Sequence, residues 1–197
     1  MSLIPQSIPE GAIRFNTDSS KMEVWVGDKW MQVAVSSPNL DGGARGLFGG
    51  GGYPNNQNII DFITISSAGN ATHFGDLIKE RKTGGGGTSN SVRGVVGGGS
   101  IPATDDGVSF IEFITLASEG NGTEFGNLTA NTKYASAVGS QTRAVFSGGS
   151  RNDAASNIID FIEIATGGNA QDFGDVAGTT VFYNNGLSDC HGGLGGF

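Results

Sequence analysis

The sequence repeats itself with a nearly constant period. Three glycine-rich heptapeptides, RGLFGGG, RGVVGGG and RAVFSGG, begin at Arg45, Arg93 and Arg143, and a degenerate copy, HGGLGGF, begins at His191. The four starts are 48, 50 and 48 residues apart. A fixed period of this length is the signature of a repeat architecture, in which each copy forms one small structural unit that packs on its neighbours. The chain is therefore expected to fold as an array of similar units.

A second signature follows the glycines in each complete copy. It contains an acidic residue and, 13 positions later, the Phe of a Phe-Gly-Asp or Phe-Gly-Asn triplet: Asp61 and Phe74, Glu112 and Phe125, Asp160 and Phe173. Catalytic residues rarely recur in every copy of a repeat. We therefore interpret the repeated acids, and the repeated arginines Arg45, Arg93 and Arg143, as residues that fix each copy through ion pairs and hydrogen bonds.

The composition of both signatures is typical of β-strands. The runs Ile59–Ile65, Phe110–Leu116 and Ile158–Ile164 are rich in Ile and Phe and are bounded by turn residues, and no segment sustains a helical period. Gly-Asn pairs follow each run, where both residues tolerate the positive φ of a tight turn. The sequence predicts an all-β fold with about four short strands per copy, as in the blades of β-propellers.

The order of these elements resembles the kelch repeat. A kelch blade has a strand ending in Gly-Gly, a variable loop, a second strand, an aromatic residue and a basic residue that opens the next copy. In this chain Gly98-Gly99, Ser100–Ser109, Phe110–Leu116, Phe125 and Arg143 hold those places. The chain departs from kelch in carrying Phe where kelch usually has Tyr and Trp. The resemblance implies a kelch-like β-propeller.

Closure of such a ring needs more than three copies, because known propellers have about 4 to 8 blades. Residues 11–28 are in register with the outer half of a copy, since Asp28 precedes Arg45 by 17 residues, as Asp76 precedes Arg93. Residues 181–197 are in register with an inner half. We expect four blades, one of them split between the N- and C-termini. The alternative is three blades per chain that close a ring by oligomerisation.

The domain boundaries follow from this register. An N-terminal β module is expected at residues 1–40, which would supply the outer strands of the closing blade. A Gly-rich repeat domain is expected at residues 41–197, with copies that start near 45, 93 and 143 and a partial copy at 191.

Charge and composition exclude several classes of partner. The chain has 11 Lys and Arg against 19 Asp and Glu, a formal net charge of −8, which disfavours binding to nucleic-acid phosphates. We expect no nucleic-acid partner, no membrane insertion and no secretory signal, because no segment has the required apolar length. Cys190 is the only cysteine, so we expect no disulfide, and we also expect no metal and no cofactor.

No enzymatic motif is apparent. The chain lacks a phosphate-binding Gly-Lys-Ser/Thr sequence and a Gly-x-Ser-x-Gly elbow. Its two histidines, His73 and His191, occupy positions that other copies fill with an acid or with Arg. We therefore expect no catalytic residues and no enzymatic activity.

The N-terminal sequence carries a second resemblance. IPEGAIRFNTDSSKMEVWVGDKWMQV resembles the short β module at the start of many tailed-phage fibre and appendage proteins, and the repeats resemble those of virion structural proteins of cyanophages. The resemblance implies a virion component, assembled in the host cytoplasm, whose partners are other virion proteins. Trp25 and Trp30 are the assembly candidates within this module.

The segments that vary between copies are the candidate contact surface. They are residues 53–58, 100–109 and 150–157, at equivalent places in successive copies. Variable polar loops on a rigid scaffold commonly present a binding surface, here for a host receptor or surface polysaccharide. A soluble, lectin-like carbohydrate-binding module is the alternative, and loops without a ligand remain a third interpretation. The candidate contact residues are Tyr53, Asn55, Asn56, Asp105, Asp106, Arg151, Asn152 and Asp153.

Overall fold

The computed structural model describes residues 8–17, 21–33, 45–52, 57–81, 85–101, 104–178 and 182–188. The chain divides into two compact units, Met1–Pro38 and Asn39–Phe197. All regular structure in the described residues is β-strand, arranged in antiparallel sheets. The all-β prediction is therefore confirmed.

The N-terminal unit is a three-stranded antiparallel meander. Its strands are β1 (Ile13–Asn16), β2 (Lys21–Val26) and β3 (Lys29–Gln32). Gly27 adopts a φ of +67° in the two-residue turn between β2 and β3, a conformation that glycine reaches without steric cost. This turn places Trp25 opposite Trp30, with the ring centroids 5.3 Å apart in an edge-to-face arrangement.

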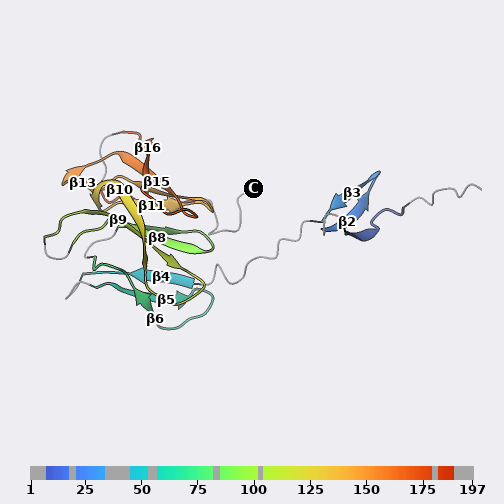
Figure 1. Cartoon of the computed structure of the whole chain (residues 1–197), viewed down its shortest axis with the longest axis horizontal. Coiled ribbons are helices and arrows are strands. Elements are labelled where there is room, and N and C mark those ends of the chain that lie inside the picture. Colours follow the sequence, from blue (N-terminus) through green and yellow to red (C-terminus); the bar gives the residue numbers. More distant parts are fainter. Residues whose placement is uncertain are drawn as a thin grey trace, which may run out of the picture. The chain divides into compact units, whose positions relative to one another are not determined.

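The second unit contains three sheets, which we number in chain order (Figure 1). Sheet 1 is formed by β4 (Arg45–Gly49), β5 (Ile59–Thr64) and β6 (Thr72–Asp76). Sheet 2 contains β7 (Gly86–Ser89), β8 (Arg93–Gly97), β9 (Val108–Thr115), β10 (Thr123–Lys133), β13 (Ser150–Arg151) and β14 (Ala154–Ala155). Sheet 3 is formed by β11 (Ser136–Gly139), β12 (Arg143–Ser147), β15 (Ile158–Glu163) and β16 (Gln171–Asp175).

The sheets reproduce the sequence repeat. Each Gly-rich heptapeptide forms one strand, which pairs with the Ile- and Phe-rich strand and then with the strand of the Phe-Gly-Asp or Phe-Gly-Asn triplet. In sheets 2 and 3 a further strand, β7 or β11, pairs with the heptapeptide strand. Sheets 2 and 3 thus each contain the expected four strands, the first of which comes from the end of the preceding copy. Sheet 1 shows three such strands within the described residues.

Sheet 2 also receives a hairpin from the following copy. The strands β13 and β14 are joined by Asn152 and Asp153, whose φ angles are 46° and 66°. Positive φ at both central residues is typical of a type I′ turn, and Asn and Asp tolerate it better than most side chains. β13 pairs with the end of β10, so this segment, expected as a variable loop, extends the neighbouring sheet.

The hydrophobic core lies between successive sheets. Ile60, Phe74 and Leu77 of copy 1 pack with Ile114 of sheet 2. A larger cluster joins sheets 2 and 3: Val95, Ile111, Phe125, Leu128, Ala144, Phe146, Ile162 and Ile164. Burial of each large apolar side chain contributes about 1.5–3 kcal/mol. Packing between copies therefore stabilises the unit, as expected for a repeat protein.

Sheets 1 and 2 are also joined by backbone hydrogen bonds. The N–H groups of Gly120 and Gly122 donate to the carbonyls of Phe74 and Asp76, at 3.0 and 2.8 Å. The Asp76 N–H donates to Oδ1 of Asn121 at 3.0 Å. The Gly-Asn turn of one copy thus docks on the Phe-Gly-Asp strand of the preceding copy, and we call this arrangement the sheet junction.

Sheets 2 and 3 form the same junction. The N–H groups of Gly168 and Ala170 donate to the carbonyls of Phe125 and Asn127, both at 2.8 Å. The Asn127 N–H donates to Oδ1 of Asn169 at 3.0 Å. The two recurring motifs of the sequence are therefore the two halves of one contact between neighbouring copies.

The fourth blade was expected to combine strands from the N- and C-termini of the chain. Strands β1–β3 pair with one another in a sheet of their own. Residues 191–197, which would complete the blade, lie outside the described residues. The split blade stays a prediction.

Candidate functional site

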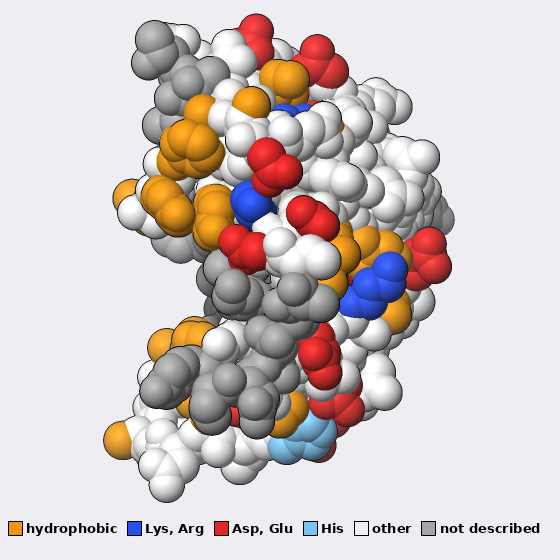
Figure 2. Space-filling view, turned by 90° about the vertical axis from the view of Figure 1, so that its left-hand side faces the viewer, with side chains coloured by type: hydrophobic (Ala, Val, Ile, Leu, Met, Phe, Trp, Pro, Cys, Tyr) orange, Lys and Arg blue, Asp and Glu red, His pale blue; other side chains and the backbone are white. Residues whose placement is uncertain are grey.

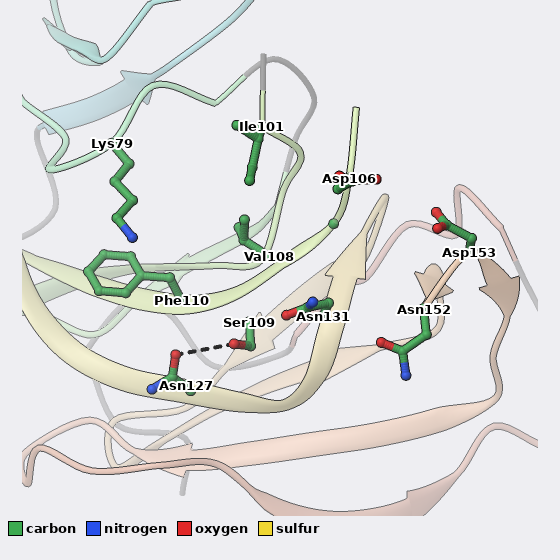
Figure 3. A pocket seen from close by; sticks show the side chains of 11 residues that line it. Lys79, Ile101, Asp106, Val108, Ser109, Phe110, Asn127, Asn131, Asn152 and Asp153 are labelled. Carbon is green, nitrogen blue, oxygen red and sulfur yellow. Dashed lines mark hydrogen bonds between the residues drawn. The ribbon is translucent and has the colours of Figure 1, made fainter. Parts of the chain in front are cut away.

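A groove of about 550 Å³ lies where two variable segments meet. One wall is formed by residues 106–110, which lead into and form the start of β9, together with Ile101. The other wall comes from Asn127 and Asn131 of β10 and from the turn at Asn152 and Asp153 (Figure 3). Segments from two successive copies thus contribute to one concave surface.

Backbone hydrogen bonds link the described residues Ile101 and 104–107. Ser100 and Gly107 form an isolated antiparallel bridge. The N–H of Ile101 donates to the Asp106 carbonyl, and the N–H of Asp105 donates to the Ile101 carbonyl, both at 2.9 Å. Asp105 adopts a φ of 61°, which closes this tight turn. Asp106 is exposed and lines the groove.

Lys133 ties the two walls together. Its Nζ lies 2.8 Å from the Asp105 carbonyl and 2.9 Å from Oδ1 of Asp153. The hydrogen bond to Asp153 raises the pKa of Lys133 above its usual value, and the negative charges of Asp153 and Asp105 act in the same direction. The ammonium therefore stays charged at neutral pH and holds both loops in one arrangement.

One end of the groove combines an aromatic ring with a cationic side chain, and amides, a hydroxyl and carboxylates line much of the rest. Nζ of Lys79 lies 4.8 Å from the ring centroid of Phe110, a cation–π distance, and Figure 3 shows both side chains at the same end of the groove. The Ser109 hydroxyl donates to Oδ1 of Asn127 at 3.2 Å. Amides, a hydroxyl and carboxylates beside an aromatic face form a surface that suits a polyhydroxylated ligand.

The structure brings together several of the expected contact residues. Asp106, Asn152 and Asp153 line the groove, and Asp105, next to Asp106 in the chain, accepts a hydrogen bond from Lys133 through its carbonyl. Tyr53, Asn55 and Asn56 lie outside the described residues. Trp25 and Trp30 lie in the N-terminal unit, where they form the aromatic pair described above. The sequence analysis missed Lys79, Phe110, Asn127, Asn131 and Lys133, because they lie outside the variable segments from which the candidates were taken.

Arg151 has a different role from the one expected. It is 6% exposed, and its Nη2 lies 2.7 Å from Oδ2 of Asp160. Its Nη1 donates to Oγ1 of Thr129 at 2.7 Å. Arg151 therefore belongs to the interior between sheets 2 and 3 and not to the contact surface. It is buried because β13 pairs with the end of β10, where the guanidinium reaches the buried carboxylate of Asp160.

Two of the three repeated acids form buried contacts between neighbouring sheets. Glu112 and Asp160 are both 0% exposed and pair with Arg81 and Arg151, at 2.6 and 2.7 Å. Each also accepts a backbone N–H from the preceding copy, from Ile78 and Thr129 respectively. These partners are not the repeated arginines.

Two of the repeated arginines, Arg45 and Arg93, instead donate to backbone carbonyls of the next sheet. Nη1 of Arg45 donates to the Leu116 carbonyl at 2.8 Å, and Nη1 of Arg93 donates to the Ile164 carbonyl at 2.9 Å. The guanidinium group of each of the three repeated arginines, Arg143 included, also lies over a Phe ring of its own sheet. That ring in turn contacts the Phe of the Phe-Gly triplet. The three pairs of rings are Phe62 and Phe74, Phe113 and Phe125, and Phe161 and Phe173.

In the described part of the chain, no three His, Cys, Asp or Glu side chains are grouped so that they could hold a metal ion. Figure 2 shows acidic side chains scattered over the visible face among neutral and hydrophobic ones. No helix in the described residues is long and apolar enough to cross a membrane. No protein-family model matches the chain, and no curated protein matches it.

Proposed function

We propose that this chain is a non-enzymatic structural protein of a tailed-phage particle, a fibre or appendage component that contacts the host surface through the groove. Its three sheets would form part of a kelch-like propeller. The proposal rests on the likeness of the N-terminal module and the repeats to phage proteins. The observation that carries the contact role is the convergence of two variable segments, from successive copies, on one groove fixed by Lys133.

The groove favours an uncharged, polyhydroxylated ligand such as a host-surface polysaccharide. Three asparagine amides and the Ser109 hydroxyl offer donors and acceptors to sugar hydroxyls, and Phe110 offers an apolar face. Asp106 and Asp153 would repel an anionic polymer, and Lys79 is the one cationic side chain among the lining residues. Short-range contacts would dominate, so binding would depend only weakly on salt.

A soluble, lectin-like module is the second candidate, and the same groove favours it. The two functions differ in where the protein resides. Peptides of this chain in purified, protease-washed particles would support the virion role. Their absence from particles, with saccharide binding retained, would favour the soluble module.

The contact role is tested by adsorption. The full chain, added in excess, should compete with particles for host cells, and the variant Asp106→Ala with Asn131→Ala should lose this competition. Both side chains are exposed, so the variant should fold. Glu119→Ala, an exposed acid outside the lining residues, serves as the matched control. Competition by the groove variant equal to that of the wild type would refute the contact role.

A further inference from the structure

The third copy carries a sheet junction that no described residue completes. Phe74 and Phe125 are 3% and 6% exposed, because the next sheet covers each of them. Phe173, the third residue of this series, is 55% exposed. Its ring still contacts Phe161 in the same edge-to-face arrangement as the other two pairs. The edge of sheet 3 thus has the apolar surface of a sheet junction, and no described residues of a following sheet cover it.

The glycines of the Phe-Gly triplets also indicate that the edge of sheet 3 is uncovered by described residues. A Cβ at Gly75 would overlap the Gly120 carbonyl, and a Cβ at Gly126 would overlap the Gly168 carbonyl. These two positions need glycine because another backbone approaches closely. A Cβ at Gly174 would meet nothing within 4 Å. The third triplet therefore keeps the shape of the contact, while no described residue supplies its partner backbone.

Sheet 1, at the other end of the series of three sheets, exposes the residues that form the second half of a sheet junction in sheets 2 and 3. Ile65 is 64% exposed, whereas Ile164, at the same position of sheet 3, is fully buried. Asn70 corresponds to Asn121 and Asn169, which both accept an N–H from the preceding sheet. Asn70 is exposed and makes no such bond within the described residues.

Among the described residues, Asp61 of sheet 1 lacks the contacts that the equivalent acids of sheets 2 and 3 make with the preceding copy. It holds the position of Glu112 and Asp160, which are 0% exposed and bonded to the preceding copy. Asp61 is only half-buried, and it has no hydrogen-bond or ion-pair partner among the described residues. At the other end, Nε of Arg143 bonds to Glu163 of its own sheet at 2.6 Å, whereas Arg45 and Arg93 reach the next sheet.

We propose that the open edge of sheet 3 binds sheet 1 of a second copy of this chain, head to tail. By the pattern of the two existing junctions, Oδ1 of Asn70 would accept the N–H of Asp175 in the other chain. The Gly69 N–H would donate to the Phe173 carbonyl. Ile65 would be covered, and its carbonyl would accept from Arg143.

The second copy is the occupant that the observations favour, because both halves of the missing contact lie on the same chain. The interface would continue the series of established junctions with the same residue types. A head-to-tail interface builds a closed ring if its rotation closes and a filament if it does not. Two chains joined at both edges would supply six sheets of this kind, within the range of about 4 to 8 blades known for propellers.

The test blocks each edge separately in the full chain. The first variant, Ile65→Asp with Asn70→Arg, blocks the sheet 1 face, and the second, Phe173→Asp, blocks the sheet 3 edge. All three side chains are exposed, and circular dichroism and thermal unfolding will verify that each variant folds. Val92→Asp is the matched control, because Val92 is 55% exposed in the β7–β8 turn and away from both edges.

Light scattering coupled to size exclusion, over a series of concentrations, gives the readout. The wild type and Val92→Asp should exceed the mass of one chain, and each blocked variant alone should have the mass of one chain. An equimolar mixture of the two blocked variants should recover a two-chain species, since one open edge of each kind remains. A wild type with the mass of one chain throughout, or a blocked variant that still self-associates, would overturn the proposal. So would a mixture that does not associate.

Discussion

Nη2 of Arg81 lies 2.6 Å from Oε1 of Glu112, and the two side chains are 4% and 0% exposed. Arg81 follows sheet 1, whereas Glu112 lies on β9 of sheet 2, so the ion pair joins two copies. Arg81 also donates to the carbonyls of Gly98 and Phe110. Oε2 of Glu112 accepts the N–H of Ile78 at 2.8 Å. Both carboxylate oxygens therefore have partners that replace the water lost on burial.

Removal of the Glu112 carboxylate should destabilise the repeat unit strongly. Glu112→Ala leaves the Arg81 guanidinium buried without a counter-ion, which costs about 3–5 kcal/mol. Urea unfolding followed by circular dichroism measures the loss. The double variant Arg81→Met with Glu112→Leu should recover most of it, because two apolar side chains of similar volume need no partner. A loss below about 1 kcal/mol for the single variant would contradict this account.

Gly75→Ala should destabilise the junction between sheets 1 and 2. The added Cβ would overlap the Gly120 carbonyl, and overpacking of this kind costs about 1–3 kcal/mol. Gly87→Ala is the matched control, since a Cβ at Gly87 would meet nothing within 4 Å. It should change the free energy of unfolding by no more than about 0.5 kcal/mol. Equal effects of the two substitutions would show that the close backbone approach is not limiting.

Asn121→Ala should weaken the same junction by a smaller amount. Loss of the bond from the Asp76 N–H to Oδ1 of Asn121 is expected to cost about 0.5–1.5 kcal/mol. Hydrogen exchange should show faster opening at the Asp76 amide. Asn70→Ala, at the same motif position in copy 1, should leave unfolding unchanged at concentrations where the chain is a monomer. If Asn70→Ala is as damaging as Asn121→Ala, the sheet 1 face is already occupied within the chain.

The sequence predicted the strands and the copies because their signal is local and repeated. A constant spacing between the acid and the Phe persists because both residues serve the contact with a neighbouring copy, as Glu112 and Phe125 show. The ion-pair partners Arg81 and Arg151 could not be predicted in this way. They come from segments that differ in length between copies, so no period identifies them.

Part of the groove lining comes from segments that the sequence singles out as variable. Equivalent variable segments were expected on one surface, and Asp106, Asn152 and Asp153 do line one groove. The Arg151 side chain faces the interior because of the β13–β14 hairpin, whose strand β13 pairs with β10 of the preceding copy. That pairing is a tertiary contact, and composition alone does not reveal it.

Lys133→Met should loosen the groove while leaving the sheets intact. The change removes the bonds from Nζ to the Asp105 carbonyl and to Asp153, so amides of residues 104–107 and 152–154 should exchange faster. Because the pKa of Lys133 is raised above 10.5 in the folded chain, its contribution to stability is complete at neutral pH. It is lost only as the pH rises through that raised value. Lys29→Met, in the N-terminal unit, should leave these amides unchanged.

Acid should destabilise the N-terminal unit through Glu23. The hydrogen bond from Asn16 lowers the pKa of Glu23 below its usual value of 4.5, and the bond from Arg14 adds to the effect. A carboxyl whose pKa is lowered by folding stabilises the folded state above its unfolded pKa. That contribution disappears as the pH falls through the lowered value.

Tryptophan fluorescence can isolate this effect, because Trp25 and Trp30 are the only two tryptophans of the chain and both lie in the N-terminal unit. The urea midpoint of the tryptophan signal should be constant near neutral pH and should fall as the pH drops below about 4.5. In Glu23→Gln the midpoint should be lower at neutral pH and should lose most of this acid dependence, because the amide does not titrate and cannot pair with Arg14. Circular dichroism of the same samples, dominated by the sheets of the larger unit, supplies the internal control. An acid dependence of the tryptophan midpoint that is the same in Glu23→Gln and in the wild type would assign the effect to another carboxyl.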